Sequence, residues 1–141
     1  MVDIRTFSPG DLWKIKLQPT QAKAIGFLTE DYALALAAAG PAITATVDGE
    51  PVACCGIARA QFNTGVLWGF VGESAGRNML RLHRAASRFI GALPMTRIES
   101  TVEQGFAPGC RWLELLGFES EGLMRKYGPD GSNHLRYARV S

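Results

Sequence analysis

The sequence predicts a mixed α/β fold (α+β), in which parallel and antiparallel strands share one sheet that has helices on both faces. Two observations support this prediction. First, an Asp48-Gly49 turn lies between two apolar runs, which is the strongest short-range signal of a β-hairpin. Second, a helical pattern over 75–90 separates two strand patterns. Those two strands are therefore expected to be parallel neighbours joined by a right-handed crossover.

The first half of the chain is predicted to contain one strand, two helices and the start of an antiparallel meander. Residues 2–7 alternate apolar and polar side chains and indicate a strand. Ser8 is expected to cap the short helix that follows. Apolar residues at helical spacing, Ile25 among them, predict a longer helix over 20–39. The strands of the meander are predicted at 42–47, 51–62 and 64–71.

The second half is predicted to alternate helices and strands before a final hairpin. The inner face of the 75–90 helix is formed by apolar residues, namely Met79, Leu82, Ala86, Phe89 and Ile90. A strand at 94–102 and a further helix follow. That helix is expected to end at Gly117, which can take the left-handed conformation, so that Phe118 folds back onto the last turn. The last strands are predicted at 122–127 and 133–140. The resulting element order is β-α-α-β-β-β-α-β-α-β-β.

The composition is that of an ordinary globular protein. The 141 residues are 47% hydrophobic and 20% charged, with a formal net charge of +2. We expect a single domain over 1–141 with no membrane-spanning segment, and a net charge this small does not indicate a nucleic-acid partner. The three cysteines cannot all pair within one chain and have no metal-ligand spacing. We therefore expect a cytoplasmic protein without a bound metal.

The end of the chain resembles the end of the GNAT superfamily of N-acetyltransferases. The segments "RWLELLGFESEGLMRKY" and "SNHLRYARV" are similar to the family's closing helix, which ends on Leu-Gly-Phe, and to the hairpin that follows it. The segment "VDGEPVACCGIA" resembles the family's second and third strands. The resemblance implies a GNAT-like acyl-CoA N-acyltransferase fold. It also implies an acetyl-CoA-dependent N-acetyltransferase that acts on an amine of a small molecule or a protein.

The same resemblance implies where acetyl-CoA binds. In the family the cofactor lies where two parallel strands separate, and backbone N–H groups at the start of the next helix hold its pyrophosphate. Binding therefore requires free N–H groups at 72–77. The family's loop pattern is met only in part, because Glu73, Gly76 and Asn78 occupy its positions. The cofactor-binding residues implied for this chain are Phe70, Val71, Gly72, Ser74, Ala75, Gly76, Arg77 and Asn78.

Catalysis in this family needs a base for the substrate ammonium group and an acid for the leaving thiolate. The acid is commonly a tyrosine on the helix before Leu-Gly-Phe, and here that position holds Leu113, which cannot donate a proton. Glu103, near the end of the 94–103 strand, is the candidate base. Tyr127 and Tyr137 both lie on the final hairpin and could substitute for the missing tyrosine, and Tyr127 is the candidate acid. His83 and His134 suggest no Ser-His-acid or metal constellation.

Two alternatives remain open at this stage. The chain is either an enzyme or a catalytically inactive GNAT-fold binding or structural protein, of the kind that bacteriophages or prophages encode and that associates with virions. The arginines at 77, 81, 84 and 88 form one helical stripe, which is either a solvated face or a contact for cofactor phosphates or an acidic partner. A homodimer through the last strands is also expected, because the 133–141 segment is predicted to be an edge strand.

Overall fold

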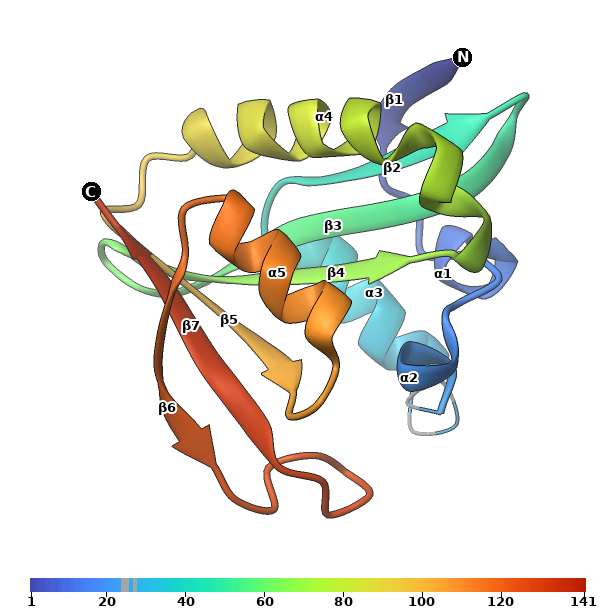
Figure 1. Ribbon diagram of the computed structural model, residues 1–141. Coiled ribbons are helices and arrows are strands. Elements are labelled where there is room, and N and C mark those ends of the chain that lie inside the picture. The colour runs from blue at the N-terminus through green and yellow to red at the C-terminus, as the bar shows by residue number, and fades with distance from the viewer. Residues whose placement is uncertain (24–25, 27) are drawn as a thin grey trace. The chain divides into compact units, whose positions relative to one another are not determined.

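The computed structural model describes residues 1–23, 26 and 28–141 (Figure 1). Its elements, in chain order, are β1 (Val2–Thr6), α1 (Asp11–Lys14), α2 (Pro19–Ala22), α3 (Glu30–Ala38), β2 (Ala42–Val47), β3 (Glu50–Gln61), β4 (Thr64–Val71), the 3₁₀ helix η2 (Glu73–Asn78), α4 (Met79–Gly91), β5 (Arg97–Glu103), α5 (Ala107–Leu115), β6 (Glu119–Met124) and β7 (His134–Val140).

The strands form one seven-stranded mixed sheet in the order β1-β2-β3-β4-β5-β7-β6. β4 and β5 are parallel neighbours, with Thr64 opposite Arg97 and Val66 opposite Glu99. The pairs β1–β2, β2–β3, β5–β7 and β6–β7 are antiparallel. The predicted mixed α/β fold and the parallel strand pair on either side of α4 are therefore confirmed.

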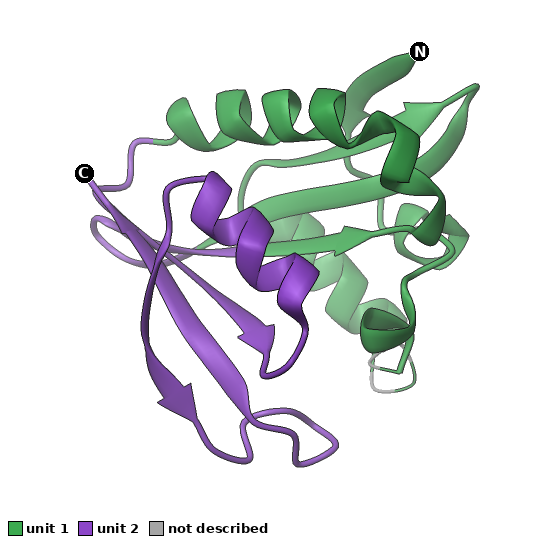
Figure 2. Cartoon of the chain, in the orientation of Figure 1, with its two compact units in different colours: residues 1–58, 68–93 green, residues 59–67, 94–141 purple. Residues whose placement is uncertain are grey.

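The chain divides into two compact units, each built from two separate stretches of sequence (Figure 2). Unit 1 comprises Met1–Ala58 and Trp68–Leu93, and unit 2 comprises Arg59–Leu67 and Pro94–Ser141. The division falls within β3 and β4, because the ends of those strands that meet in their hairpin belong to unit 2.

Unit 1 has an apolar core on each face of its part of the sheet. Adjacent residues of β3 point to opposite faces, so Cys54 joins a cluster with Phe7 and Leu12, whereas Ala53 joins a cluster with Leu82 of α4. The predicted inner face of α4 is confirmed by the burial of Leu82, Ala86 and Ile90. The two cysteines of β3 are not candidate nucleophiles. Burial raises the pKa of Cys54 far above its usual range and that of Cys55 to about 12.

The predicted continuous helix over 20–39 is wrong. α2 ends at Ala22, and α3 begins only at Glu30. The physical reason is a new helix start at Thr29, whose extended backbone (φ −117°, ψ 165°) is non-helical and whose hydroxyl accepts a hydrogen bond from Tyr32 N–H at 3.1 Å. Ile25, one of the residues that predict this helix, lies outside the described residues.

The prediction that the Ser8 side chain caps α1 is also wrong, because no side chain caps this helix start. α1 begins at Asp11, and the Ser8 N–H donates to the Asp11 carboxylate at 2.9 Å. The same carboxylate accepts hydrogen bonds from Arg5 and from the buried hydroxyl of Thr44, at 2.8 Å in the second case. Asp11 therefore ties β1, β2 and the start of α1 together.

The predicted end of α5 at Gly117 is confirmed. Gly117 has a φ of +93°, its N–H donates to Glu114 O at 3.0 Å, and the Phe118 N–H donates to Leu113 O at 2.9 Å. These two bonds form a Schellman motif, which glycine adopts without steric cost. Phe118, directly after the helix end, is 2% exposed.

The final hairpin differs from expectation in its order within the sheet. β7 pairs with both β5 and β6, so β6 is the strand at this edge. The prediction that 133–141 forms the edge strand is therefore wrong, and with it the reason for expecting a dimer through that segment. β6 also runs earlier than the predicted 122–127, ending at Met124, and Lys126 takes a left-handed conformation (φ 55°) in the turn that follows.

Candidate functional site

The segment expected to bind the cofactor divides into residues that serve the core and residues that face solvent. The Phe70 ring packs against Trp68 with the ring centroids 6.2 Å apart, Val71 packs on the α4 core, and Ala75 is 1% exposed. Gly72 is buried so tightly that an added Cβ would lie 2.8 Å from Val52 O. These four residues position the loop: Gly72 and Ala75 are buried, and Phe70 and Val71 are half-buried.

The backbone N–H groups of this loop are partly occupied. Gly72 N–H donates to Val52 O at 2.8 Å, Glu73 N–H to Lys16 O at 2.8 Å, and Ala75 N–H to Gly72 O at 3.1 Å. The requirement for free N–H groups across 72–77 is therefore not met at these three positions. A backbone cradle of the kind implied for a pyrophosphate does not fit residues 72–75 of this chain.

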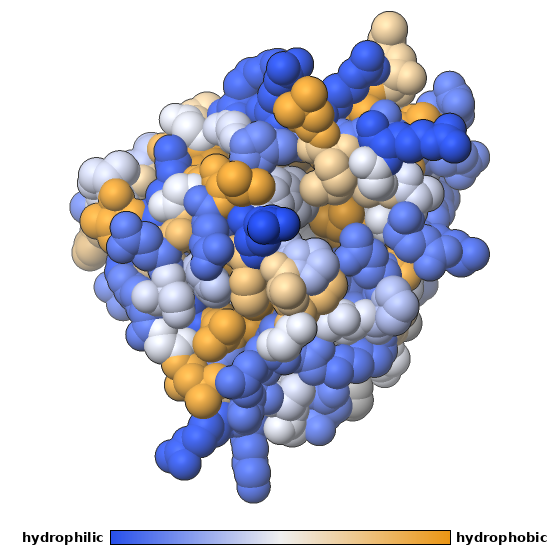
Figure 3. Space-filling view, in the orientation of Figure 1, coloured by the Kyte–Doolittle hydropathy of each residue, from blue (hydrophilic) through white to orange (hydrophobic). Residues whose placement is uncertain are grey.

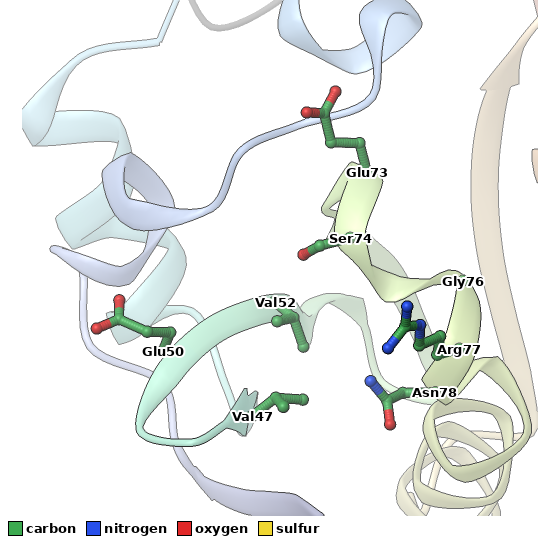
Figure 4. Close-up of a pocket in the computed structure, with 8 residues that line it drawn as sticks. All are labelled: Val47, Glu50, Val52, Glu73, Ser74, Gly76, Arg77 and Asn78. Carbon is green, nitrogen blue, oxygen red and sulfur yellow. The ribbon is translucent and has the colours of Figure 1, made fainter.

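The remaining loop residues line an open hollow of about 640 Å³ within unit 1 (Figure 4). Its other wall comes from the β2–β3 hairpin, and its lining residues are Val47, Glu50, Val52, Glu73, Ser74, Gly76, Arg77 and Asn78. Ser74, Arg77 and Asn78 point into the hollow in Figure 4. The nearby Gly76 leaves the backbone open, because a Cβ there would meet nothing within 4 Å.

The polar groups in the hollow fit an anion. The Arg77 guanidinium, the Asn78 amide and the Ser74 hydroxyl are all hydrogen-bond donors, and the residues that the structure describes include no hydrogen-bond partner for these side chains. The carboxylates of Glu50 and Glu73 turn away from the hollow in Figure 4. Glu73 instead forms an exposed ion pair with Lys16 at 3.0 Å. The loop can thus hold a phosphate through side chains.

The candidate catalytic residues, Glu103 and Tyr127, both lie beside His134 in unit 2. Glu103 of β5 is directly opposite His134 of β7, and side chains at such positions share one face of the sheet. The Tyr127 ring is 5.4 Å from the His134 ring, centroid to centroid, and half of the Tyr127 side chain is exposed. The structure therefore brings the candidate base and the candidate acid to one histidine.

His134 is a functional candidate that sequence reasoning missed. Its Nε2 atom lies 3.2 Å from Ser132 Oγ, and its Nδ1 atom is buried without a hydrogen-bond partner among the described residues. Ser132 contacts the Nε2 atom and Glu103 lies opposite in the strand pairing, but no carboxylate among the described residues bonds the Nδ1 atom, so the expectation that His134 joins no Ser-His-acid group is not overturned. The Ser-x-His spacing was visible in the sequence, but the register that places Glu103 opposite His134 was not.

Neither of the other positions considered for the acid can replace Tyr127. Leu113, at the usual tyrosine position, is buried in unit 2. Tyr137 is 3% exposed, and its hydroxyl lies 3.4 Å from a Glu114 carboxylate oxygen. Burial, helped by neighbouring Cys110 and Glu114, raises the pKa of Tyr137 far above its usual range. Of the two hairpin tyrosines, both within the described part of the chain, Tyr127 is the exposed one.

Two further features of the described residues bear on the kind of site. Among residues 1–23, 26 and 28–141, no group of three or more His, Cys, Asp or Glu side chains is arranged to hold a metal ion. No helix in the same part of the chain is long and apolar enough to span a membrane.

Comparison with known proteins was made by sequence and by structure. No protein-family model matches the sequence, and the search of curated proteins finds no match either. Solved structures, in contrast, match over the whole chain. Ard1 from Thermoplasma volcanium has a TM-score of 0.80 at 21% identity, covering 99% of this chain and 97% of its own.

Two other similar structures are acetyltransferases. A GNAT-family acetyltransferase from Bacillus anthracis has a TM-score of 0.71 at 17% identity, over 99% of this chain and 94% of its own. The ribosomal-protein-S18-alanine N-acetyltransferase from Escherichia coli has a TM-score of 0.71 at 16% identity, with the same coverage. The chain therefore has the fold of the GNAT N-acetyltransferases along its whole length.

Proposed function

We propose that this protein is an acetyl-CoA-dependent N-acetyltransferase that acts on a primary amine of a small molecule or a protein, in a reducing cytoplasm. The observation that carries the proposal is the similarity to the Bacillus anthracis GNAT-family acetyltransferase and the Escherichia coli N-acetyltransferase, each over 99% of this chain at a TM-score of 0.71. A fold alone does not define an activity. The proposal is supported further by two groups of side chains that match the chemical needs of the reaction.

The first group would hold the cofactor's phosphates. Acetyl-CoA supplies an acetyl group activated as a thioester. Since Gly72, Glu73 and Ala75 already use their N–H groups, the anion would be bound by Arg77, with Ser74 and Asn78 donating hydrogen bonds. Arginine suits this task because its planar guanidinium donates two parallel hydrogen bonds to a phosphate.

The second group would move the protons. The Glu103 carboxylate takes a proton from the substrate ammonium, which frees the nitrogen lone pair for attack on the acetyl carbon. As the new C–N bond forms and the C–S bond breaks, the Tyr127 hydroxyl gives its proton to the departing sulfur. His134 lies between these two groups, opposite Glu103 and against the Tyr127 ring. In these steps Glu103, Tyr127 and His134 act only on protons and do not serve as metal ligands.

The experiment is an acetylation screen over small amines and peptide N-termini, with the product identified by mass spectrometry. On any amine that is acetylated, E103Q and Y127F are expected to lower kcat about 100-fold or more, which is the ordinary contribution of a positioned acid or base. Matched controls are E119Q and Y32F, because Glu119 and Tyr32 are exposed at other sites. These controls should retain kcat within about twofold.

Two results would contradict the proposal. Bound acetyl-CoA with no acetylated amine across the screen would point to a non-catalytic acyl-CoA-binding protein. Activity that survives both E103Q and Y127F would leave acetyl transfer in place but remove the assignment of the two proton-transfer residues.

A further inference from the structure

The solvent face of α4 carries a row of arginines that no other part of the described structure neutralises. Arg81, Arg84 and Arg88 are all exposed, and none has a hydrogen bond or ion pair with a residue that the structure describes. We call these three residues the α4 arginine row. Arg77 lies outside it because its side chain points into the hollow.

The row differs from other arginines in the same protein. Arg5 is paired with Asp11 at 2.6 Å, and Arg97 and Arg136 are each paired with Glu99. The sequence explains the contrast, since it contains no Asp or Glu between Glu73 and Glu99. The positive charge of the α4 arginine row is therefore either solvated or available to bind a partner.

The spacing of the row matches a helical or similarly periodic ligand. The residues stand at i, i+3 and i+7 on one helix, so their Cα atoms span roughly 10 Å along its axis. An acidic helix with carboxylates at the same spacing presents one oxygen pair to each guanidinium. Leu80, which is 63% exposed, lies at the edge of the row and offers an apolar contact beside the charges.

A protein segment fits this surface better than a nucleic acid does. Binding of single strands usually combines basic side chains with exposed aromatic rings on which bases stack. The exposed large hydrophobic on α4 is Leu80, whereas Phe89 is partly buried. In the space-filling view the upper rim of the molecule, over α4, is mainly hydrophilic with apolar atoms interspersed (Figure 3). The formal net charge of +2 is also small for a nucleic-acid-binding protein.

We propose that the α4 arginine row, together with Leu80, docks an acidic amphipathic helix of a partner protein. Each exposed ion pair contributes about twofold to fivefold in affinity, so three pairs and an apolar contact give a moderate, salt-sensitive complex. This inference stands on the charge and exposure of α4. It does not depend on acetyl transfer.

The test is fluorescence anisotropy with a labelled helical peptide that carries glutamates at i, i+3 and i+7 and a leucine at their edge. R84Q/R88Q should weaken binding about fourfold or more. The matched control is R59Q/R125Q, which removes the same charge from exposed positions in unit 2 and should change the affinity by less than about twofold. Raising the salt from 0.1 M to 1 M shortens the Debye length from about 10 Å to about 3 Å and should weaken binding to wild type strongly.

Three results would overturn the proposal. Equal losses in R84Q/R88Q and R59Q/R125Q would mean that only net charge matters. Equal binding of a peptide with the same composition but permuted glutamates would remove the claimed spacing. Tighter binding of an oligouridine RNA than of the peptide, at the same salt, would replace the acidic protein segment by a nucleic acid. Circular dichroism of each variant confirms that the fold is intact.

Discussion

Replacement of Asp11 by asparagine tests how unit 1 is held together. Asp11 is 2% exposed, and its carboxylate accepts hydrogen bonds from Arg5 Nη1 and Nη2, the Ser8 N–H and the Thr44 hydroxyl, at 2.6 to 2.9 Å. Thr44 is itself fully buried. Because α1 and the two N-terminal strands all meet at this carboxylate, we expect its charge to contribute directly to folding.

The size of the effect follows from the pKa of Asp11. Burial alone would raise this pKa, but the hydrogen bonds from Arg5, Ser8 and Thr44 outweigh burial and lower it from 3.8 to about 2. A shift of this size corresponds to about 2 kcal/mol. Because the folded pKa is the lower one, the contribution is fully present above the unfolded pKa. It is lost as the pH falls through the folded pKa, with about half gone by pH 3.

The assay is urea unfolding of wild type and D11N at pH 7 and at pH 3. We expect D11N to lose about 2–3 kcal/mol at pH 7, which is less than the usual cost of breaking a fully buried ion pair because Arg5 can be solvated. The gap to wild type should shrink by about 1 kcal/mol at pH 3. The control D3N, at an exposed position of β1, should stay within about 0.5 kcal/mol. A gap that is unchanged by pH would refute the assignment of this stability to the Asp11 charge.

Three further predictions concern the loop and the helix end. G72A should lower the free energy of unfolding by about 1–3 kcal/mol in urea titration, because its Cβ would lie 2.8 Å from Val52 O. G76A should be nearly neutral, because its Cβ would meet no atom within 4 Å. Equal effects of the two substitutions would contradict the packing of the loop. G117A should cost about 1 kcal/mol in the same assay because of its φ of +93°, and no loss would argue against the Schellman motif. E73Q should tighten acetyl-CoA binding about fivefold at low salt in calorimetry, since it removes a negative charge from the lining of the hollow. Weaker binding would mean that Glu73 supports the loop instead.

The local features of the fold were predictable because short-range physics sets them. The Asp48-Gly49 hairpin and the Gly117 helix end both need a positive φ, which glycine adopts easily, so the glycines in the sequence predict them directly. The break before α3 was not predicted, because apolar spacing outweighed the capping signal of Thr29. Local signals of this kind compete, and periodicity alone does not decide between one helix and two.

The site was less predictable because its properties depend on contacts between distant parts of the sequence. Nothing near Glu73 indicates that the Lys16 carbonyl occupies its N–H. Likewise, Glu103 meets His134 only through the register between β5 and β7, and a slip of one residue would place them on opposite faces. Residue types and loop position could be predicted, but the occupancy of backbone groups and the pairing of side chains could not.

Calorimetric titration with acetyl-CoA is the most direct test of the proposed acetyltransferase, using CoA as a second ligand. We predict saturable binding at one site that R77Q weakens about tenfold, because Arg77 is the cation in the hollow, while R59Q, which removes the same charge from unit 2, leaves it unchanged. Absence of binding to wild type at millimolar acetyl-CoA would contradict the proposal while leaving the fold intact. Binding that R77Q does not affect would place the cofactor away from this loop.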